Sequence, residues 1–202
     1  EPTEKAFDEA AQQFGITVQR IDGRTAEQVQ RSFAAADVFC SLSDNIQETF
    51  GLTPIEAMAA GLPCILSDWN GYRETAIHGE HGFLIATQMP NRVGFESIEQ
   101  GFADGTLNYD HYIGHVHALT SVDIESAAQA LATLIEQPQL RQRMGQAGRQ
   151  HARQNFDWEQ VIQRYDELWC EQQAQQQTQP QARLPRIFSS RLSPADLFGH
   201  YP

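Results

Sequence analysis

Apolar residues recur along the first part of the chain with two different periods. Residues 3–14 repeat them at helical spacing, and Gly15 follows as a residue suited to end a helix. Residues 16–21 alternate and are rich in β-branched side chains, which predicts a strand. Thr25 then opens a capping-box sequence, so we predict a helix that runs to residue 36.

The alternation of strand and helix continues as far as residue 85. The pattern predicts a strand over 37–42, a helix over 54–60, a strand over 63–67, a short helix over 71–78 and a strand over 83–85. This order predicts an α/β fold with a doubly wound, Rossmann-like parallel sheet. Right-handed crossovers would bring the loops at 22–24, 43–53 and 68–74 to the carboxyl edge of the sheet, where such folds bind ligands.

Residues 86–122 break this alternation. They are irregular apart from a predicted helix around 109–119, which indicates a helical insertion. Predicted helices over 123–136, 138–154 and 157–176 follow, and the last carries Trp158, Tyr165 and Trp169 at spacings typical of core packing. We therefore predict one domain over 1–170, with an insertion at about 86–122 and these C-terminal helices.

Residues 171–202 differ in composition from the rest of the chain. They begin with a Gln-rich stretch and end in a tail that contains apolar residues, which suits a linker followed by a docking segment. Among the apolar residues of this tail are Leu184, Ile187, Phe188, Leu197, Phe198 and Tyr201.

Composition narrows the class of protein. The net charge of −12 argues against nucleic acid or an anionic membrane surface as the main partner. The sequence shows neither an apolar run of membrane-spanning length nor a signal peptide, so cytoplasm is the expected location. Cys40 and Cys64 fall in predicted strands, and we expect buried, reduced thiols.

The segment between strand 37–42 and helix 54–60 carries the candidate chemistry. Glu48 and Glu56 lie eight positions apart, with Gly51 between them and Pro54 at the predicted first helical position. A helix N-terminus suits a phosphate, and carboxylates accept hydrogen bonds from hydroxyls, so the segment suits a sugar nucleotide. Two simpler interpretations are dipole complementation by each acid and a glycoside hydrolase pair. Gly51 and the predicted helix start favour the sugar nucleotide over these interpretations, because both features suit a phosphate.

This segment resembles the Glu-x7-Glu motif of the family 4 glycosyltransferases, which have the GT-B fold. The similarity extends in order through 34–39, 56–68, 71–74, 82–85, 140–145 and 156–158. It implies that the chain is the C-terminal, nucleotide-sugar-binding part of a retaining glycosyltransferase of the hexosyltransferase type. Such an enzyme transfers sugar from a nucleotide diphosphate donor to an acceptor hydroxyl.

The resemblance also implies roles for individual residues. Glu48 is the expected catalytic residue, which orients the transferred sugar, and Glu56 is expected to bind the ribose. Thr49 stands where the family usually has Gly. The remaining donor-binding candidates are Phe50, Gly51, Leu52 and Thr53, with Gly71 and Arg73 in the loop after strand 63–67 and Gly23 and Arg24 near the nucleobase.

The resemblance implies no cofactor, with a UDP- or GDP-linked donor as substrate. The sequence contains no Asp-x-Asp, which fits metal-independent transfer. His111, His115 and His117 fall in the predicted insertion, and we expect a solvated helix there rather than a zinc site.

The chain begins with Glu1, and family members carry an N-terminal acceptor domain before this point. We therefore expect a piece of a larger enzyme, inactive alone, whose partners are the donor and that domain; any membrane contact would be made through the domain. The alternatives are a nucleotide-sugar epimerase or a sugar phosphorylase of GT-B-like fold, and a non-catalytic binding module.

Overall fold

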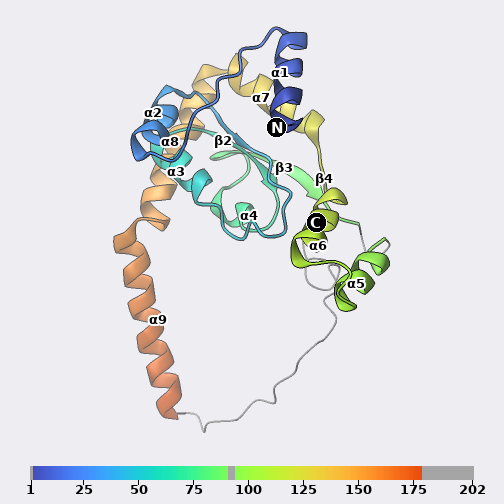
Figure 1. Ribbon diagram of the computed structural model, residues 1–202. Coiled ribbons are helices and arrows are strands. Elements are labelled where there is room, and N and C mark those ends of the chain that lie inside the picture. The colour runs from blue at the N-terminus through green and yellow to red at the C-terminus, as the bar shows by residue number, and fades with distance from the viewer. Residues whose placement is uncertain (1, 91–93, 179–202) are drawn as a thin grey trace. The chain divides into compact units, whose positions relative to one another are not determined.

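The computed structural model of the protein describes residues 2–90 and 94–178. In this part of the chain the elements, in order, are α1 (Pro2–Phe14), α2 (Ala26–Ala35), β1 (Phe39–Ser41), α3 (Leu52–Ala60), β2 (Cys64–Asp68), α4 (Tyr72–Thr75), β3 (Gly82–Gln88), α5 (Glu96–Ala103), α6 (Tyr109–Ala118), β4 (Ser121–Val122), α7 (Ile124–Glu136), α8 (Pro138–Asn155) and α9 (Trp158–Thr178) (Figure 1). The chain forms two compact units, residues 1–36 and 37–202.

The first unit contains α1 and α2. Gly15 follows α1 in the left-handed conformation, and Thr25 caps α2 by accepting a hydrogen bond from the backbone N–H of Gln28. The strand predicted over 16–21 is wrong, because these residues form no regular structure. Arg20 instead ties the segment to α1 through a 2.7 Å hydrogen bond to Asp8.

The second unit is built on a four-stranded sheet in the order β1-β2-β3-β4. β1, β2 and β3 are parallel, with Phe39 opposite Cys64 and Cys64 opposite Gly82. β4 pairs with β3 in the antiparallel direction, because the insertion leaves the end of β3 and returns beside it. The parallel part agrees with the predicted α/β fold, and β4 was not predicted.

Helices cover both faces of the parallel strands. Ile65 on β2 packs in a cluster with Ala130 and Leu134 of α7, whereas the thiol of neighbouring Cys64 lies against the Pro54 carbonyl of α3. Because successive side chains of a strand point to opposite faces, α3 and α7 lie on opposite sides of β2. This is the doubly wound arrangement expected from the sequence.

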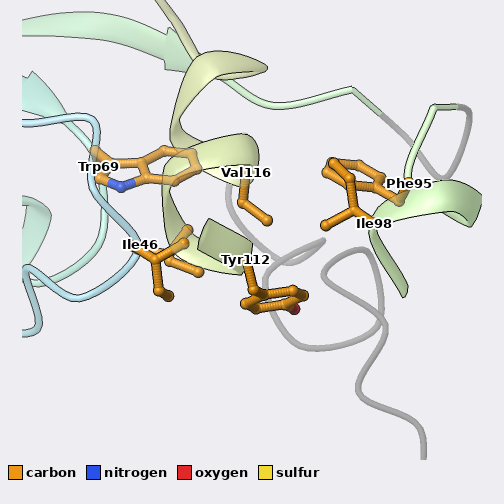
Figure 2. Packing of buried hydrophobic residues seen from close by; sticks show 7 residues of the cluster. Ile46, Trp69, Phe95, Ile98, Tyr112 and Val116 are labelled. Atoms are coloured by element: carbon orange, nitrogen blue, oxygen red, sulfur yellow. The ribbon is translucent and has the colours of Figure 1, made fainter. Parts of the chain in front are cut away.

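The insertion belongs to the second unit and packs on the rest of it through a separate cluster, shown in Figure 2. Its helix α6 agrees with the prediction, whereas α5 was not predicted. Ile46 and Trp69, from the loops after β1 and β2, face Val116 and Tyr112 of α6 (Figure 2). The cluster contains Ile46, Trp69, Phe95, Ile98, Tyr112, Ile113 and Val116.

Two predictions about burial are wrong. Trp158, Tyr165 and Trp169 do not pack in a core, since their exposed fractions are 77%, 52% and 59%. Cys40 is also exposed, because it lies on β1 at an edge of the four-stranded sheet, whereas Cys64 is buried as predicted. The prediction of a docking tail falls on residues 179–202, outside the described residues.

Candidate functional site

The loops after β1 and β2 meet at the carboxyl edge of the sheet. The indole Nε1 of Trp69 donates a 3.2 Å hydrogen bond to the carbonyl of Asn45, and the side-chain amide of Asn70 donates one of 3.2 Å to the carbonyl of Ile46. Both donors are buried. The second loop therefore fixes the backbone of the first at the two residues before Gln47 and Glu48.

Two glycines allow the same loops to approach more closely. A Cβ on Gly71 would lie 2.1 Å from the carbonyl oxygen of Thr49, and one on Gly51 would lie 2.1 Å from Cε1 of Tyr72. Gly51 also has a φ of +74°, a conformation that favours glycine. The hydroxyl of Tyr72 shares a 2.9 Å hydrogen bond with that of Ser41 at the end of β1. The structure thus brings predicted residues Gly51 and Gly71 into one cluster and adds Tyr72, which was not predicted.

The N-terminus of α3 is exposed and has no side-chain cap. The helix begins at Leu52 rather than Pro54, and Gly51 at its N-cap supplies no side-chain hydrogen bond. The backbone N–H groups of Leu52 and Thr53 are among those that a helix cannot satisfy internally, and both residues are exposed. With this start, Pro54 is the third residue of the helix and not the first, as was predicted, and Glu56 lies in the second turn.

The two acids occupy different environments in one short segment. Glu48 is half-buried in the loop, and its backbone N–H donates a 3.1 Å hydrogen bond to the carbonyl of Asn45. Glu56 is exposed on α3. Phe50, between them, is 42% exposed and meets Phe156 edge-on, with ring centroids 6.0 Å apart. The segment is therefore anchored in part to the end of α8.

The other candidate residues are placed less favourably. Arg73 forms a 2.7 Å ion pair with Asp68 at the end of β2, so its charge is already matched beside the site. Gly23 and Arg24 belong to the first unit, where Arg24 pairs with Asp22 and lowers the pKa of that carboxyl. Because residues 16–21 are not a strand, loop 22–24 does not follow a sheet strand. Its role near a nucleobase stays a prediction.

The insertion reaches this edge through a contact that sequence reasoning missed. Nε2 of His117 on α6 lies 2.7 Å from Oδ1 of Asp44, in the loop that carries Glu48. Spacing alone cannot reveal such a pair, because its members are far apart in the sequence. Within residues 2–90 and 94–178, no three His, Cys, Asp or Glu side chains gather in a way that could hold a metal ion.

Comparison with known proteins gives the class to which this fold corresponds. The structure matches that of sucrose-phosphate synthase from Thermosynechococcus elongatus with a TM-score of 0.53 and 22% identity, over 86% of this chain and 35% of that one. The chain thus has the fold of a GT-B glycosyltransferase. No helix in the described part is both long enough and apolar enough to cross a membrane.

Sequence comparisons agree with this class. Residues 1–94 match the family model "Glycosyl transferases group 1". D-inositol 3-phosphate glycosyltransferase of Corynebacterium efficiens is 28% identical over 84% of this chain and 32% of its own length. Glycogen synthase of Mycobacterium tuberculosis is 26% identical over 69% of this chain and 25% of its own length. The predicted resemblance to glycosyltransferases is confirmed, and the chain spans about a third or less of these relatives.

Proposed function

We propose that this chain is the donor-binding part of a retaining glycosyltransferase that transfers a hexose from a UDP- or GDP-linked donor to an acceptor hydroxyl. The observation that carries the proposal is the approach of Gly71 to Thr49 at the open N-terminus of α3. This approach joins two loops at the edge where parallel sheets bind ligands. The similarity to curated glycosyltransferases supports the same function.

In this proposal each part of the segment 48–56 has a role. The backbone N–H groups of Leu52 and Thr53 bind the diphosphate, and they stabilise the charge that develops on it when the sugar leaves. Glu56 accepts hydrogen bonds from the ribose hydroxyls, and Glu48 orients the transferred sugar. Transfer proceeds without a metal ion, since these amides hold the leaving group.

Transfer also needs an acceptor held against the donor. We propose that an N-terminal acceptor domain of a longer chain supplies that half of the cleft, so the chain alone binds donor weakly and transfers nothing. We propose the cytoplasm as the location of the enzyme, with any membrane contact made by the acceptor domain.

The test is calorimetric titration of the chain with UDP and with GDP. We expect one nucleotide to bind and Glu56→Ala to weaken it by roughly 1.5–3 kcal/mol, the value of hydrogen bonds to a charged group. Glu125→Ala is the matched control, because Glu125 is an exposed acid in the first turn of α7. Equal affinity in the Glu56→Ala variant and the parent chain would rule out the ribose role.

A second titration, with a Glu48 variant, tests the role of this acid. Glu48→Gln should leave the affinity for the nucleotide nearly unchanged but weaken the binding of the complete UDP- or GDP-sugar, because the acid is assigned to the sugar.

The alternative functions predict other results. If neither nucleotide binds to this chain or to a longer chain with its acceptor domain, a non-catalytic module is favoured. Conversion of free nucleotide sugar without acceptor would indicate an epimerase, and dependence on inorganic phosphate would indicate a phosphorylase.

A further inference from the structure

Helix α9 carries a row of exposed apolar side chains. Trp158, Ile162, Tyr165 and Trp169 follow one another at steps of four, three and four residues, which places them on one face of the helix. Their exposed fractions are 77%, 53%, 52% and 59%, and Leu168 beside them is 44% exposed. We call these five residues the aromatic face of α9.

This face lacks a covering surface in the part of the chain that the structure describes. Within Trp158–Thr178 not one residue is buried. Most helices in proteins are stabilised by packing of one apolar face, and a contiguous exposed apolar patch of this kind marks an interaction site. Tyr165 and Trp169 contact each other, with ring centroids 5.8 Å apart, but this pair covers only part of the face.

Acidic side chains border the aromatic face. Glu159 and Asp166 line a shallow groove together with Trp158 and Ile162. Glu167 and Glu171 add two further acids to the helix, against one arginine, Arg164. A partner with apolar and basic residues would therefore match this surface, whereas a second copy of α9 would bring like charges together.

The end of this same chain has that composition. Residues 183–201 contain the arginines Arg183, Arg186 and Arg191 against one acid, Asp196. Most of their large apolar residues fall in two groups, Leu184, Ile187 and Phe188, then Leu197, Phe198 and Tyr201, with Leu192 between them. The two groups suit the two ends of the aromatic face, at Trp169 and at Trp158, with Leu192 between them.

The chain is long enough to return. The helix rises by roughly 14 Å between Trp169 and Thr178, at 1.5 Å per residue. Residues 179–183 can span roughly 17 Å when extended. Pro180 and Pro185 oppose continuation of the helix, so the chain can reverse direction after α9. The first apolar group then reaches Trp169 and the second reaches Trp158.

We propose that residues 184–201 bind the aromatic face of α9 within the same chain. The apolar groups cover the tryptophans and Tyr165, and the arginines pair with the acids of α9. The proposal stands independently of nucleotide binding, because none of its residues belongs to the candidate donor site.

Tryptophan fluorescence tests this directly in the full chain. Trp69 is 1% exposed and serves as an internal constant, whereas Trp158 and Trp169 report on the face. The triple variant Leu184→Ser, Ile187→Ser, Phe188→Ser should shift the emission to the red and raise quenching by acrylamide. Leu131→Ser, at a 40% exposed site on α7, should change neither signal. Identical quenching in the parent chain and the triple variant would overturn the proposal.

A crosslinking experiment identifies the occupant. Cys170 is exposed on α9, next to Trp169. In a Cys40→Ser background, Phe188→Cys should link to Cys170 through a short bismaleimide at monomer mass. Crosslinked dimers would identify a second copy as the occupant and overturn the proposal, as would the absence of any product. A charge swap completes the test: Arg186→Glu should lower the yield and Glu171→Arg in the same chain should restore it.

Discussion

The backbone of Gly71 lies so close to Thr49 that a Cβ on Gly71 would stand only 2.1 Å from the carbonyl oxygen of Thr49. The φ of Gly71 is −62°, which any residue adopts, so the glycine is required by space and not by backbone conformation. The two loops at the carboxyl edge therefore contact each other directly through their backbones. A side chain at residue 71 must push the Thr49–Phe50 backbone, and with it the loop that carries Glu48.

Gly71→Ala should accordingly lower the free energy of unfolding by roughly 1–3 kcal/mol, the usual cost of overpacking. It should also weaken nucleotide binding, because the displaced loop leads into the N-terminus of α3. Gly114→Ala is the control, since a Cβ there meets nothing within 4 Å and the residue lies inside α6. That change should be neutral or stabilising by roughly 0.5–1 kcal/mol. Urea unfolding of the three proteins measures both values, and equal stability of Gly71→Ala and the parent would contradict the close approach.

A second pair of glycines sets the packing of α8 on α3. A Cβ on Gly145 would lie 2.1 Å from the carbonyl oxygen of Gly61, whereas one on Gly148 would lie 3.1 Å from Cγ of Met58. Backbone cannot move aside as a methionine side chain can. Gly145→Ala should therefore destabilise the protein by roughly 1–3 kcal/mol, and Gly148→Ala by less. The denaturant concentrations at the unfolding midpoint give this comparison when the dependence of the unfolding free energy on denaturant is the same in both variants. A larger loss of stability in Gly148→Ala than in Gly145→Ala would show that the contact with Gly61 is not rigid.

The sequence predicted the parallel strands, α6 and the helices after the insertion, because their patterns are long or closely bounded by turn residues. It failed at 16–21, where alternating residues have no strand to pair with in the described part of 1–36. It also placed the start of α3 two residues late. That start depends on the positive φ of Gly51 and its contact with Tyr72, and a local pattern does not contain this information.

The candidate site was predictable to a similar degree. The motif from Glu48 to Glu56 and the glycine at 71 were recognisable, because the resemblance is local in sequence. Tyr72, Ile46 and the pair of Asp44 with His117 were not, because each depends on a contact between distant segments. For α9, the apolar spacing predicted core packing, which is wrong, because spacing does not show whether another element covers that face.

Ile46 should be the residue through which the insertion stabilises the first loop. Its side chain is 4% exposed and packs with Trp69 and with Val116 of α6 (Figure 2). Ile46→Ala should cost roughly 2–5 kcal/mol, because it leaves a cavity among residues from three segments. Ile77→Ala, at a 47% exposed isoleucine, should cost much less. Thermal unfolding monitored by circular dichroism distinguishes them, and similar losses would mean that the cluster does not hold the loop.

Stability should also depend on His81 in mildly acidic solution. Burial lowers the pKa of His81 below its ordinary value of 6.5, the nearby His151 lowers it further, and Glu80 opposes the shift. The two imidazole centroids lie 4.3 Å apart, and Nδ1 of His81 accepts a 3.2 Å hydrogen bond from the backbone N–H of Ile77.

Because the folded-state pKa of His81 is lower than the unfolded-state value, the unfolded protein binds more protons near that pH. The contribution of His81 is complete above the unfolded pKa and is lost as pH falls through the folded pKa. The free energy of unfolding should therefore decrease from about pH 7.5 to about pH 5. His81→Asn retains an acceptor for Ile77 but does not titrate, so its decrease should be smaller. Parallel pH profiles for the two proteins would exclude His81 as the source.

The three thiols should react at different rates for reasons that the structure gives separately. Burial raises the pKa of the Cys64 thiol to about 12, so at neutral pH it is protonated as well as inaccessible. Cys40 is exposed as a residue, but partial burial raises the pKa of its thiol. Since the thiolate is the reactive form, Cys170 should react first with a disulfide reagent, Cys40 more slowly and Cys64 only on unfolding. Cys170→Ser should remove the fastest phase alone. Reaction of Cys64 in the native protein at the rate of Cys40 would contradict the packing of β2 beneath α3.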